Sequence, residues 1–368
     1  MDKILLIFTG GTICSSEDKE SGKSQSNAIK TGSLLEKNFN LVYKNKVKFI
    51  SVYLKQDVLS ENMTFNTLNE LIKILKKSTT KSNYKGVLIM HGTDTLAYTS
   101  SILSILLAGY TIPIFLVSAH LNLKDKLTNG YINFTSAVEM ILNGVLPNVY
   151  VVYENVLNRN YARGKTLVHL GAKLLNSFNF SNNFHSQEEV NIEDYYNGKY
   201  LGKSFETNSL LIDKINKLSN GVLLINPYTN LNYKAINLKG VKAIVHGTYH
   251  SESVCIGRAK NPSKDKNKNL TIDMVKNEDK PYSILNLLNK CKAKNIPVFL
   301  VPCNEKTAKY GTTANAISCG AIGIKNITIE SGYAKTVIGV SLGLKGEELI
   351  KFLNKSVNYE NTVEIKEF

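Results

Sequence analysis

Short apolar runs alternate with longer amphipathic segments through the first half of the chain. The runs are rich in isoleucine, valine and leucine and cover residues 4–8, 49–54, 87–90, 114–117 and 149–153. Runs of this length and composition predict strands buried on both faces, which is typical of parallel sheets. Between them, apolar residues at helical spacing predict helices over residues 67–77, 95–107 and 133–143. The fold class we expect is α/β, with a doubly wound, mostly parallel sheet.

The alternation changes after residue 153. Residues 158–160 predict a turn and residues 166–175 a second strand, so a β-hairpin joins the sheet. Beyond a polar stretch, shorter apolar runs over residues 222–225, 243–245, 298–301 and 336–342 alternate with predicted helices over residues 284–291 and 313–319. This alternation predicts a second α/β domain. The division we expect is a catalytic domain over residues 1–188, a linker over 189–219 and a smaller C-terminal domain over 220–368.

Length and composition limit the class of protein. The 368 residues exceed one ordinary core, and hydrophobic and charged fractions of 43% and 20% are typical of globular proteins. No 18-residue apolar stretch and no secretory signal occur, so we expect a cytoplasmic protein without a membrane partner. Five cysteines without C-x-x-C spacing favour reduced thiols, and we expect no structural metal.

A formal net charge of +15 raises the question of nucleic-acid binding. The charge is mostly dispersed lysine, and its densest runs lie in polar segments without interleaved aromatic residues. Single-strand binding sites combine basic grooves with aromatic stacking platforms, which this pattern lacks. A solvated basic surface is the simpler interpretation, and a nucleic-acid partner is not expected.

Candidate functional residues directly follow two of the predicted strands. The segment 9–12 (Thr-Gly-Gly-Thr) follows the first run, and the segment 91–95 (His-Gly-Thr-Asp-Thr) follows the third. In a parallel sheet both loops reach the same edge, where ligands usually bind. A threonine hydroxyl there can act as a nucleophile if a base removes its proton and donors hold the resulting oxyanion. The two loops therefore predict one composite pocket suited to acyl transfer.

These two segments, unbroken and in this order, resemble the signatures of the bacterial-type asparaginase and glutaminase family, and most closely its cytoplasmic type I form. The resemblance implies that Thr12 is the nucleophile that attacks a side-chain amide. It also implies that Thr93 is a second catalytic hydroxyl and that Asp94 takes part in a proton relay.

Further segments extend the resemblance to about nine tenths of the chain. Ser60 and Glu61 match the family positions that hold the α-carboxylate and α-amino groups of the substrate. Ala119 matches a position whose backbone carbonyl contacts the leaving amide. Gly11 and Gly92 complete the implied substrate-binding set, since glycine lets the backbone approach a ligand closely.

The sequence departs from the family pattern at two places. Residues 14–31 correspond to a loop that usually carries a tyrosine, and they contain none. At the position of the relay lysine the chain has His169, which is either a relay group or a packed hairpin histidine. Lys165 and Lys173 lie nearby, and we expect both at the surface.

The resemblance implies an L-asparagine amidohydrolase, a hydrolase acting on linear amides that releases L-aspartate and ammonia. It implies no cofactor and a homodimer or homotetramer. Two alternatives stay open: a non-catalytic homologue that binds asparagine or aspartate, and the amidase subunit of tRNA-dependent transamidation. The second usually has an extra N-terminal domain, whereas this sequence begins directly at its first predicted strand. The sequence also leaves the preference for asparagine over glutamine open, because one methylene changes binding by only about 1–3 kcal/mol.

Overall fold

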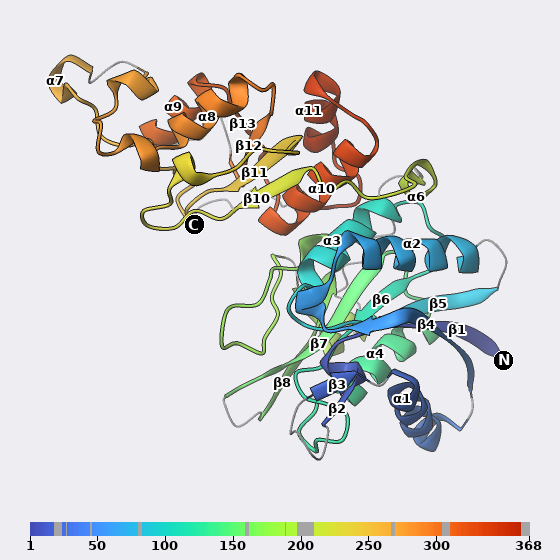
Figure 1. Cartoon of the computed structure of the whole chain (residues 1–368). Helices are drawn as coiled ribbons and strands as arrows, with labels where there is room; N and C mark the ends of the chain where they lie inside the picture. Colours follow the sequence, from blue (N-terminus) through green and yellow to red (C-terminus); the bar gives the residue numbers. More distant parts are fainter. Residues whose placement is uncertain are drawn as a thin grey trace. The chain divides into compact units, whose positions relative to one another are not determined.

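The chain forms two compact units in the computed structural model (Figure 1). The first contains Met1–Lys217 and Val357–Tyr359, and the second contains Leu218–Ser356 and Glu360–Phe368. The structure describes residues 1–17, 24–26, 28–44, 46–79, 83–158, 162–187, 189–196, 210–265, 269–303 and 310–361. Residues 197–209 of the expected linker therefore lie outside the described residues, as do residues 159 and 160 of the expected hairpin turn.

A seven-stranded sheet forms the centre of the first unit, in the order β4-β1-β5-β6-β7-β8-β9. The strands are β1 (Asp2–Gly10), β4 (Val47–Val58), β5 (Tyr84–Met90), β6 (Ile114–Val117), β7 (Val149–Val156), β8 (Arg163–Leu170) and β9 (Glu189–Asn191). The five strands from β4 to β7 run parallel, and β8 and β9 are antiparallel additions. This confirms the predicted mostly parallel sheet with an added hairpin. The second hairpin strand ends at Leu170, because the chain then turns into the short helix η3 (Gly171–Lys173).

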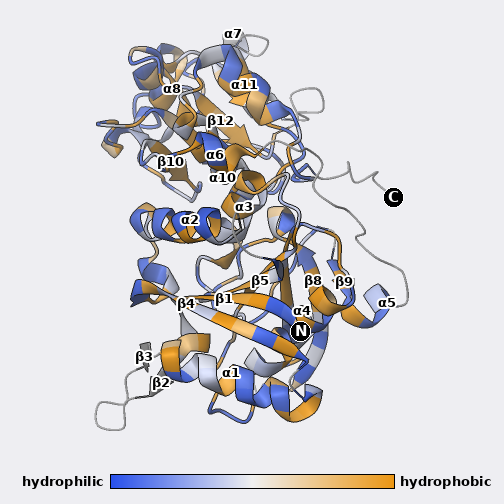
Figure 2. Cartoon of the chain, turned by 90° about the vertical axis from the view of Figure 1, so that its right-hand side faces the viewer, coloured by the Kyte–Doolittle hydropathy of each residue, from blue (hydrophilic) through white to orange (hydrophobic). Residues whose placement is uncertain are grey.

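Helices cover both faces of this sheet (Figure 1). On one face lie α1 (Ala28–Tyr43) and α4 (Gly130–Leu142), and on the other lie α2 (Phe65–Thr79) and α3 (Leu96–Leu106). Phe8 of β1 packs with Phe39 of α1 and Phe134 of α4 in one apolar core. In Figure 2, β1 and β5 are orange over most of their length, whereas α2 carries blue residues beside orange ones. This contrast follows from burial of the strands on both faces and of the helix on one.

The segment after β1 contains more regular structure than its composition indicates. A short 3-10 helix η1 (Thr12–Cys14) is followed by strands β2 (Ser15–Glu17) and β3 (Ser24–Ser26), which pair antiparallel. Helix α1 begins at Ala28, whose backbone N–H donates to Asp57 Oδ2 at 3.2 Å. Residues 18–23 and 27, within the loop in which the family tyrosine is missing, lie outside the described residues.

The second unit has a parallel four-stranded sheet in the order β10-β11-β12-β13. Its strands are β10 (Val222–Ile225), β11 (Ala243–Gly247), β12 (Val298–Val301) and β13 (Ala321–Gly323). Its longer helices are α8 (Ile284–Lys292), α9 (Gly311–Ser318), α10 (Ile329–Ser341) and α11 (Gly346–Asn354). The predicted smaller α/β domain is confirmed, and the apolar run 336–342 belongs to α10. Within the described part of the chain, no helix is both long and apolar enough to cross a membrane.

Candidate active site

Three loops meet at the carboxyl edge of the large sheet, after the adjacent strands β4, β1 and β5. The first continues β1 through Gly11 into η1, and the second follows β4 and forms the 3-10 helix η2 (Ser60–Asn62). The third, residues 91–95, joins β5 to α3. Because these strands are parallel and neighbours, their loops reach one edge, as the sequence predicts.

Two glycines set how closely the loops approach. Gly11 has φ +83°, and a Cβ placed there would lie 2.3 Å from the Cα of Gly92. A Cβ on Gly92 would lie 2.5 Å from Ser60 Oγ. Real Cβ atoms do not approach other atoms so closely, so only glycine allows the three loops to touch.

The Thr12 backbone is fixed by the turn that it begins. Cys14 N–H donates to the Gly11 carbonyl at 2.9 Å, and Ser15 Oγ donates to the Thr12 carbonyl at 2.9 Å. Thr12 and Thr93 are both half-buried, and neither hydroxyl forms a hydrogen bond with another described residue. Both hydroxyls are therefore available to a ligand at this edge.

A hydrogen-bonded pair joins the second and third loops. Ser60 Oγ donates to Asp94 Oδ2 at 2.9 Å and accepts from the Asp94 backbone N–H at 3.0 Å. The Thr95 hydroxyl donates to the Ser60 carbonyl at 2.9 Å. Ser60 is buried, whereas Asp94 and Glu61 are exposed, so both carboxylates can reach a ligand from solvent. Ser60 thus holds Asp94 in place while leaving its second oxygen open.

His91 is a structural group of the third loop. Its Nδ1–H donates to the Gly92 carbonyl at 2.7 Å, and its backbone N–H donates to the Val117 carbonyl at 2.9 Å. Burial lowers its pKa to about 4, against the opposing effects of the Gly92 carbonyl and Asp94. His91 is therefore neutral at pH 7 and orients the glycine on which the loop contact depends.

Ala119 lies in the loop after β6, the strand next to β5. This loop is anchored by two asparagines at the start of α4: Asn133 Nδ2 donates to the Ser118 carbonyl at 2.9 Å, and Asn129 Oδ1 accepts from His120 N–H at 3.0 Å. Ala119 is fully buried. Its carbonyl accepts no hydrogen bond from the residues that the structure describes, so it can accept one from a ligand.

His169 lies on the face of the sheet that α3 covers. Its neighbours Val168 and Leu170 face the core beneath α1 and α4, so alternation along β8 directs His169 to the opposite face. On that face, Ser100 Oγ of α3 donates to the Gly171 carbonyl at 3.0 Å. No hydrogen bond joins His169 to Thr93 or Asp94.

The His169 side chain has one unpaired ring nitrogen. Its Nδ1 forms a 2.9 Å hydrogen bond with Ser186 Oγ, whereas its buried Nε2 has no partner within the described ranges. Burial, followed by repulsion from His185, lowers its pKa to about 3. His169 is therefore a neutral imidazole with one nitrogen left for a proton donor or acceptor.

The two lysines near His169 differ in exposure. Lys165 is exposed, as predicted, but the prediction that Lys173 lies at the surface is wrong. Lys173 is 1% exposed, because η3 packs against α3 after the hairpin strand. Sequence reasoning also missed Asp57, which caps α1, and Thr95, which ties the third loop to Ser60. Both contacts join segments distant along the chain, and only tertiary structure reveals them.

Comparison with protein families identifies the first unit. The family model described as "Asparaginase, N-terminal" matches residues 3–196, more than half of the chain. Among solved structures, the thermostable L-asparaginase from Thermococcus kodakarensis is similar, with a TM-score of 0.68 and 18% identity over 98% of this chain and all of that one. L-asparaginase I from Vibrio cholerae gives a TM-score of 0.69 and 19% identity over 98% of this chain and 99% of that one. At these identities the likeness shows the fold alone.

The curated proteins that are similar in sequence are described differently from the solved structures. A glutamyl-tRNA(Gln) amidotransferase subunit from Sulfurisphaera tokodaii is 31% identical over 173 residues. The match covers 47% of this chain and 36% of that protein. The corresponding protein from Sulfolobus acidocaldarius is 30% identical over the same shares. The chain thus covers little more than a third of these relatives.

Proposed function

Because the chain belongs to the asparaginase family, we propose that it is an L-asparagine amidohydrolase, a hydrolase acting on linear amides. The observation that carries this proposal is the meeting of Thr12, Thr93 and Asp94 at one sheet edge around the Gly11–Gly92 contact. Two hydroxyls without a hydrogen-bond partner among the described residues, beside a fixed carboxylate, suit a two-step acyl transfer.

In the first step, Thr12 Oγ1 loses its proton and bonds to the carbon of the side-chain amide of the substrate. The C–N bond breaks, the proton leaves with the nitrogen, and ammonia departs from an acyl-enzyme. Water then attacks the ester carbon, which releases L-aspartate and returns the proton to Thr12. A threonine hydroxyl is a weak nucleophile at neutral pH, so this scheme requires a group that accepts its proton.

The substrate-binding groups come from four loops. Ser60 and Glu61 hold the α-carboxylate and α-amino groups, and Asp94 also binds the ammonium through its exposed carboxylate. The backbones of Gly11 and Gly92 approach the substrate where no Cβ intervenes. The unpaired carbonyl of Ala119 accepts a hydrogen bond from the amide nitrogen that leaves. These groups together fit a small amino-acid amide.

The proton relay differs from that of the family. Thr93 assists the attack of Thr12 or of water, and Asp94 stabilises the positive charge that passes through the relay. In place of the family lysine, His169 offers a neutral imidazole whose Nε2 is unpaired. An imidazole that is neutral at pH 7 can accept a proton without first losing one.

The proposal also includes the cellular location and the oligomeric state of the protein. We expect a cytoplasmic homodimer or homotetramer that takes L-asparagine as its small-molecule substrate and uses no cofactor.

A second candidate function is the amidase subunit of tRNA-dependent transamidation. It is favoured by the curated relatives, which are described as subunits of a glutamyl-tRNA(Gln) amidotransferase.

Ammonia release and binding, measured together, test the proposal. The purified chain is incubated with L-asparagine and with L-glutamine, and ammonia and the acidic amino acid are quantified. We expect one ammonia for each L-aspartate. Binding of L-asparagine by calorimetry without ammonia would instead identify a non-catalytic binding protein. Turnover that appears only with glutamine, and only when glutamyl-tRNA and the other transamidation components are added, would identify the amidase subunit.

A further inference from the structure

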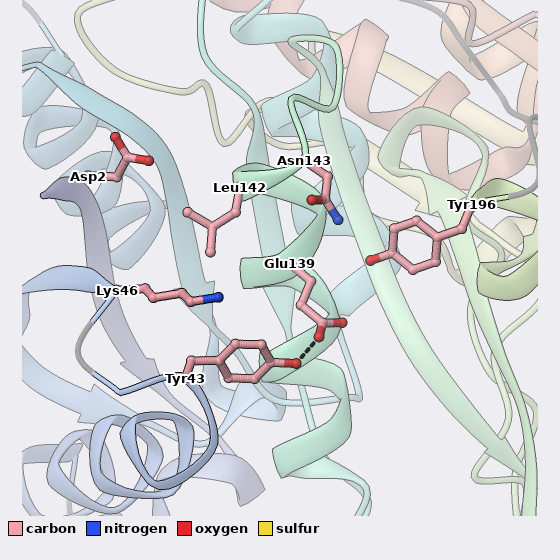
Figure 3. Close-up of a pocket in the computed structure, with 7 residues that line it drawn as sticks. All are labelled: Asp2, Tyr43, Lys46, Glu139, Leu142, Asn143 and Tyr196. Atoms are coloured by element: carbon pink, nitrogen blue, oxygen red, sulfur yellow. Dashed lines mark hydrogen bonds between the residues drawn. The ribbon is translucent and has the colours of Figure 1, made fainter.

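A pocket of about 690 Å³ opens at the amino edge of the large sheet, the edge opposite the candidate active site. It is lined by Asp2, Tyr43, Lys46, Glu139, Leu142, Asn143 and Tyr196 (Figure 3). Its volume lies within the range of small-molecule sites in proteins. Asp2 begins β1 and Thr12 follows the end of that strand, so the two sites lie roughly 30 Å apart by the rise of a β-strand.

Glu139 is the main anionic group of the pocket. Tyr43 donates its hydroxyl hydrogen bond to Glu139 Oε1 (Figure 3). No Lys, Arg or His in the described part of the chain forms an ion pair with Glu139. Burial raises the pKa of its carboxyl group, because the charged form is partly desolvated. A carboxylate that forms no ion pair with the protein binds a cationic ligand more strongly than a neutral one, because the hydrogen bond between them is charge-assisted.

Lys46 supplies the opposite charge. Its side chain extends toward the pocket from the side away from Tyr196 (Figure 3). Lys46 is exposed and has no ion-pair partner in the ranges that the structure describes. Asp2, the other carboxylate of the pocket, is already paired with Lys85 Nζ at 2.9 Å. The pocket thus contains one carboxylate and one ammonium group that form no ion pair with any residue the structure describes.

Aromatic rings and a leucine complete the walls. The Tyr43 ring is held by stacking on Phe39, with centroids 4.4 Å apart and an interplanar angle of 12°. Tyr196 packs edge-on against Tyr195 at 5.3 Å, and its hydroxyl points into the pocket between Asn143 and Glu139 (Figure 3). Burial and the nearby Glu139 raise the pKa of Tyr196 to about 12, so it stays a neutral donor. Leu142 and the Tyr43 ring form apolar walls of the pocket, and the Tyr196 ring lies on the other side of Glu139 from Lys46 (Figure 3).

We propose that this pocket binds a free amino acid with an apolar or aromatic side chain, separately from the candidate active site. The α-ammonium group bonds to Glu139 and the two tyrosine hydroxyls lie beside it, while the α-carboxylate pairs with Lys46. The side chain packs on Leu142 and the tyrosine rings. A simple amine can form an ion pair only with Glu139, and a simple carboxylate only with Lys46. A zwitterionic amino acid can form both ion pairs, so we expect it to bind most tightly.

Calorimetry on the full chain tests the proposal with three probes: L-phenylalanine, 2-phenylethylamine and 3-phenylpropionate. We expect saturable binding of L-phenylalanine. Glu139→Gln keeps the acceptor for Tyr43 and removes the charge, and it weakens L-phenylalanine at least tenfold while leaving 3-phenylpropionate unchanged. Lys46→Met weakens L-phenylalanine by a similar factor and leaves 2-phenylethylamine unchanged.

Matched controls come from α1. Glu36→Gln removes a half-buried carboxylate that accepts from Ser51 Oγ at 3.0 Å, and Lys37→Met removes an exposed ammonium outside the pocket. Both leave L-phenylalanine binding unchanged, as does Ser60→Ala in the candidate active site. Absence of saturable binding, equal affinity in Glu139→Gln and wild type, or loss of binding in Ser60→Ala would each overturn the proposal. None of these results depends on amidohydrolase activity.

Discussion

At the scale of single residues, the candidate active site depends on glycines that have no room for a side chain. Gly92→Ala places a Cβ 2.5 Å from Ser60 Oγ and 3.1 Å from Gly11 Cα, so the three loops must separate. We expect kcat/KM for L-asparagine to fall at least about 100-fold, since small displacements of catalytic groups have such effects. Gly311→Ala is the matched control, because no atom of the described residues lies within 4 Å of its new Cβ. Equal activity of the two variants would contradict the loop contact.

His169 allows a second prediction at this scale. If its unpaired Nε2 serves the relay, His169→Ala lowers kcat by about 10²-fold or more with little change in KM. Steady-state kinetics of ammonia release measure this. His169→Lys, which restores the family residue, retains or regains activity. A packed histidine behaves differently: His169→Ala then lowers the melting temperature while kcat stays unchanged, and that result would remove His169 from the mechanism.

At the scale of elements, the C-terminal segment Val357–Tyr359 belongs to the first unit, where Tyr359 packs against the core and Asn358 forms hydrogen bonds. Asn358 Nδ2 donates to the Ser104 carbonyl at 3.0 Å and to Asn148 Oδ1 at 2.9 Å. In Asn358→Ala, the Ser104 carbonyl and Asn148 Oδ1 stay buried and each loses one hydrogen bond. We expect this loss to lower the unfolding free energy by about 2–3 kcal/mol. Urea denaturation measures the change. Asn354→Ala, at an exposed position of α11, is the control and changes stability by less than about 0.5 kcal/mol.

Most of the buried strands could be predicted from apolar runs alone, because burial on both faces leaves a continuous hydrophobic signal, whereas the three-residue strand β13 was not predicted. Strands β6, β10 and β12 match the runs residue for residue. Helix α1 was not predicted, since polar residues and a glycine interrupt its apolar positions and only a stripe that includes Leu35 and Phe39 is buried. The three-residue strand β9 has a polar sequence and exists only through its pairing with β8.

The candidate active site was predictable in part. Two short motifs place Thr12, Thr93 and Asp94 at one sheet edge, because parallel strands present their carboxyl ends together. The hydrogen bond from Ser60 to Asp94 joins residues 34 positions apart, and no local pattern encodes it. The burial of Lys173 depends likewise on how the hairpin packs against α3. Contacts between distant segments are the part that sequence reasoning could not supply.

At the scale of the whole molecule, three buried histidines make stability depend on pH. Burial lowers the pKa of His91 and His246 to about 4 and that of His169 to about 3. His246 is fixed as a neutral ring, since its Nδ1–H donates to the Gly247 carbonyl and its Nε2 accepts from the Tyr233 hydroxyl. The unfolded chain, with histidine pKa values near 6.5, binds more protons below that pH, so unfolding free energy falls on acidification.

We expect each of these histidines to remove about 2 kcal/mol of unfolding free energy between pH 7 and pH 5. Chemical denaturation at a series of pH values measures the slope. His246→Gln reduces the loss of unfolding free energy between pH 7 and pH 5 by about the contribution of one histidine, because glutamine does not titrate. A stability that is constant from pH 7 to pH 5 would show that the three imidazoles are not held neutral.

The central claim is that this chain hydrolyses L-asparagine through Thr12. Ammonia release from L-asparagine by wild type and by Thr12→Ala, measured side by side on protein whose fold is checked by circular dichroism, tests it most directly. We predict steady turnover by wild type and a loss of at least about 10³-fold in Thr12→Ala, as expected for a nucleophile. Equal ammonia release by both proteins, or none by a wild type that binds L-asparagine, would contradict the claim.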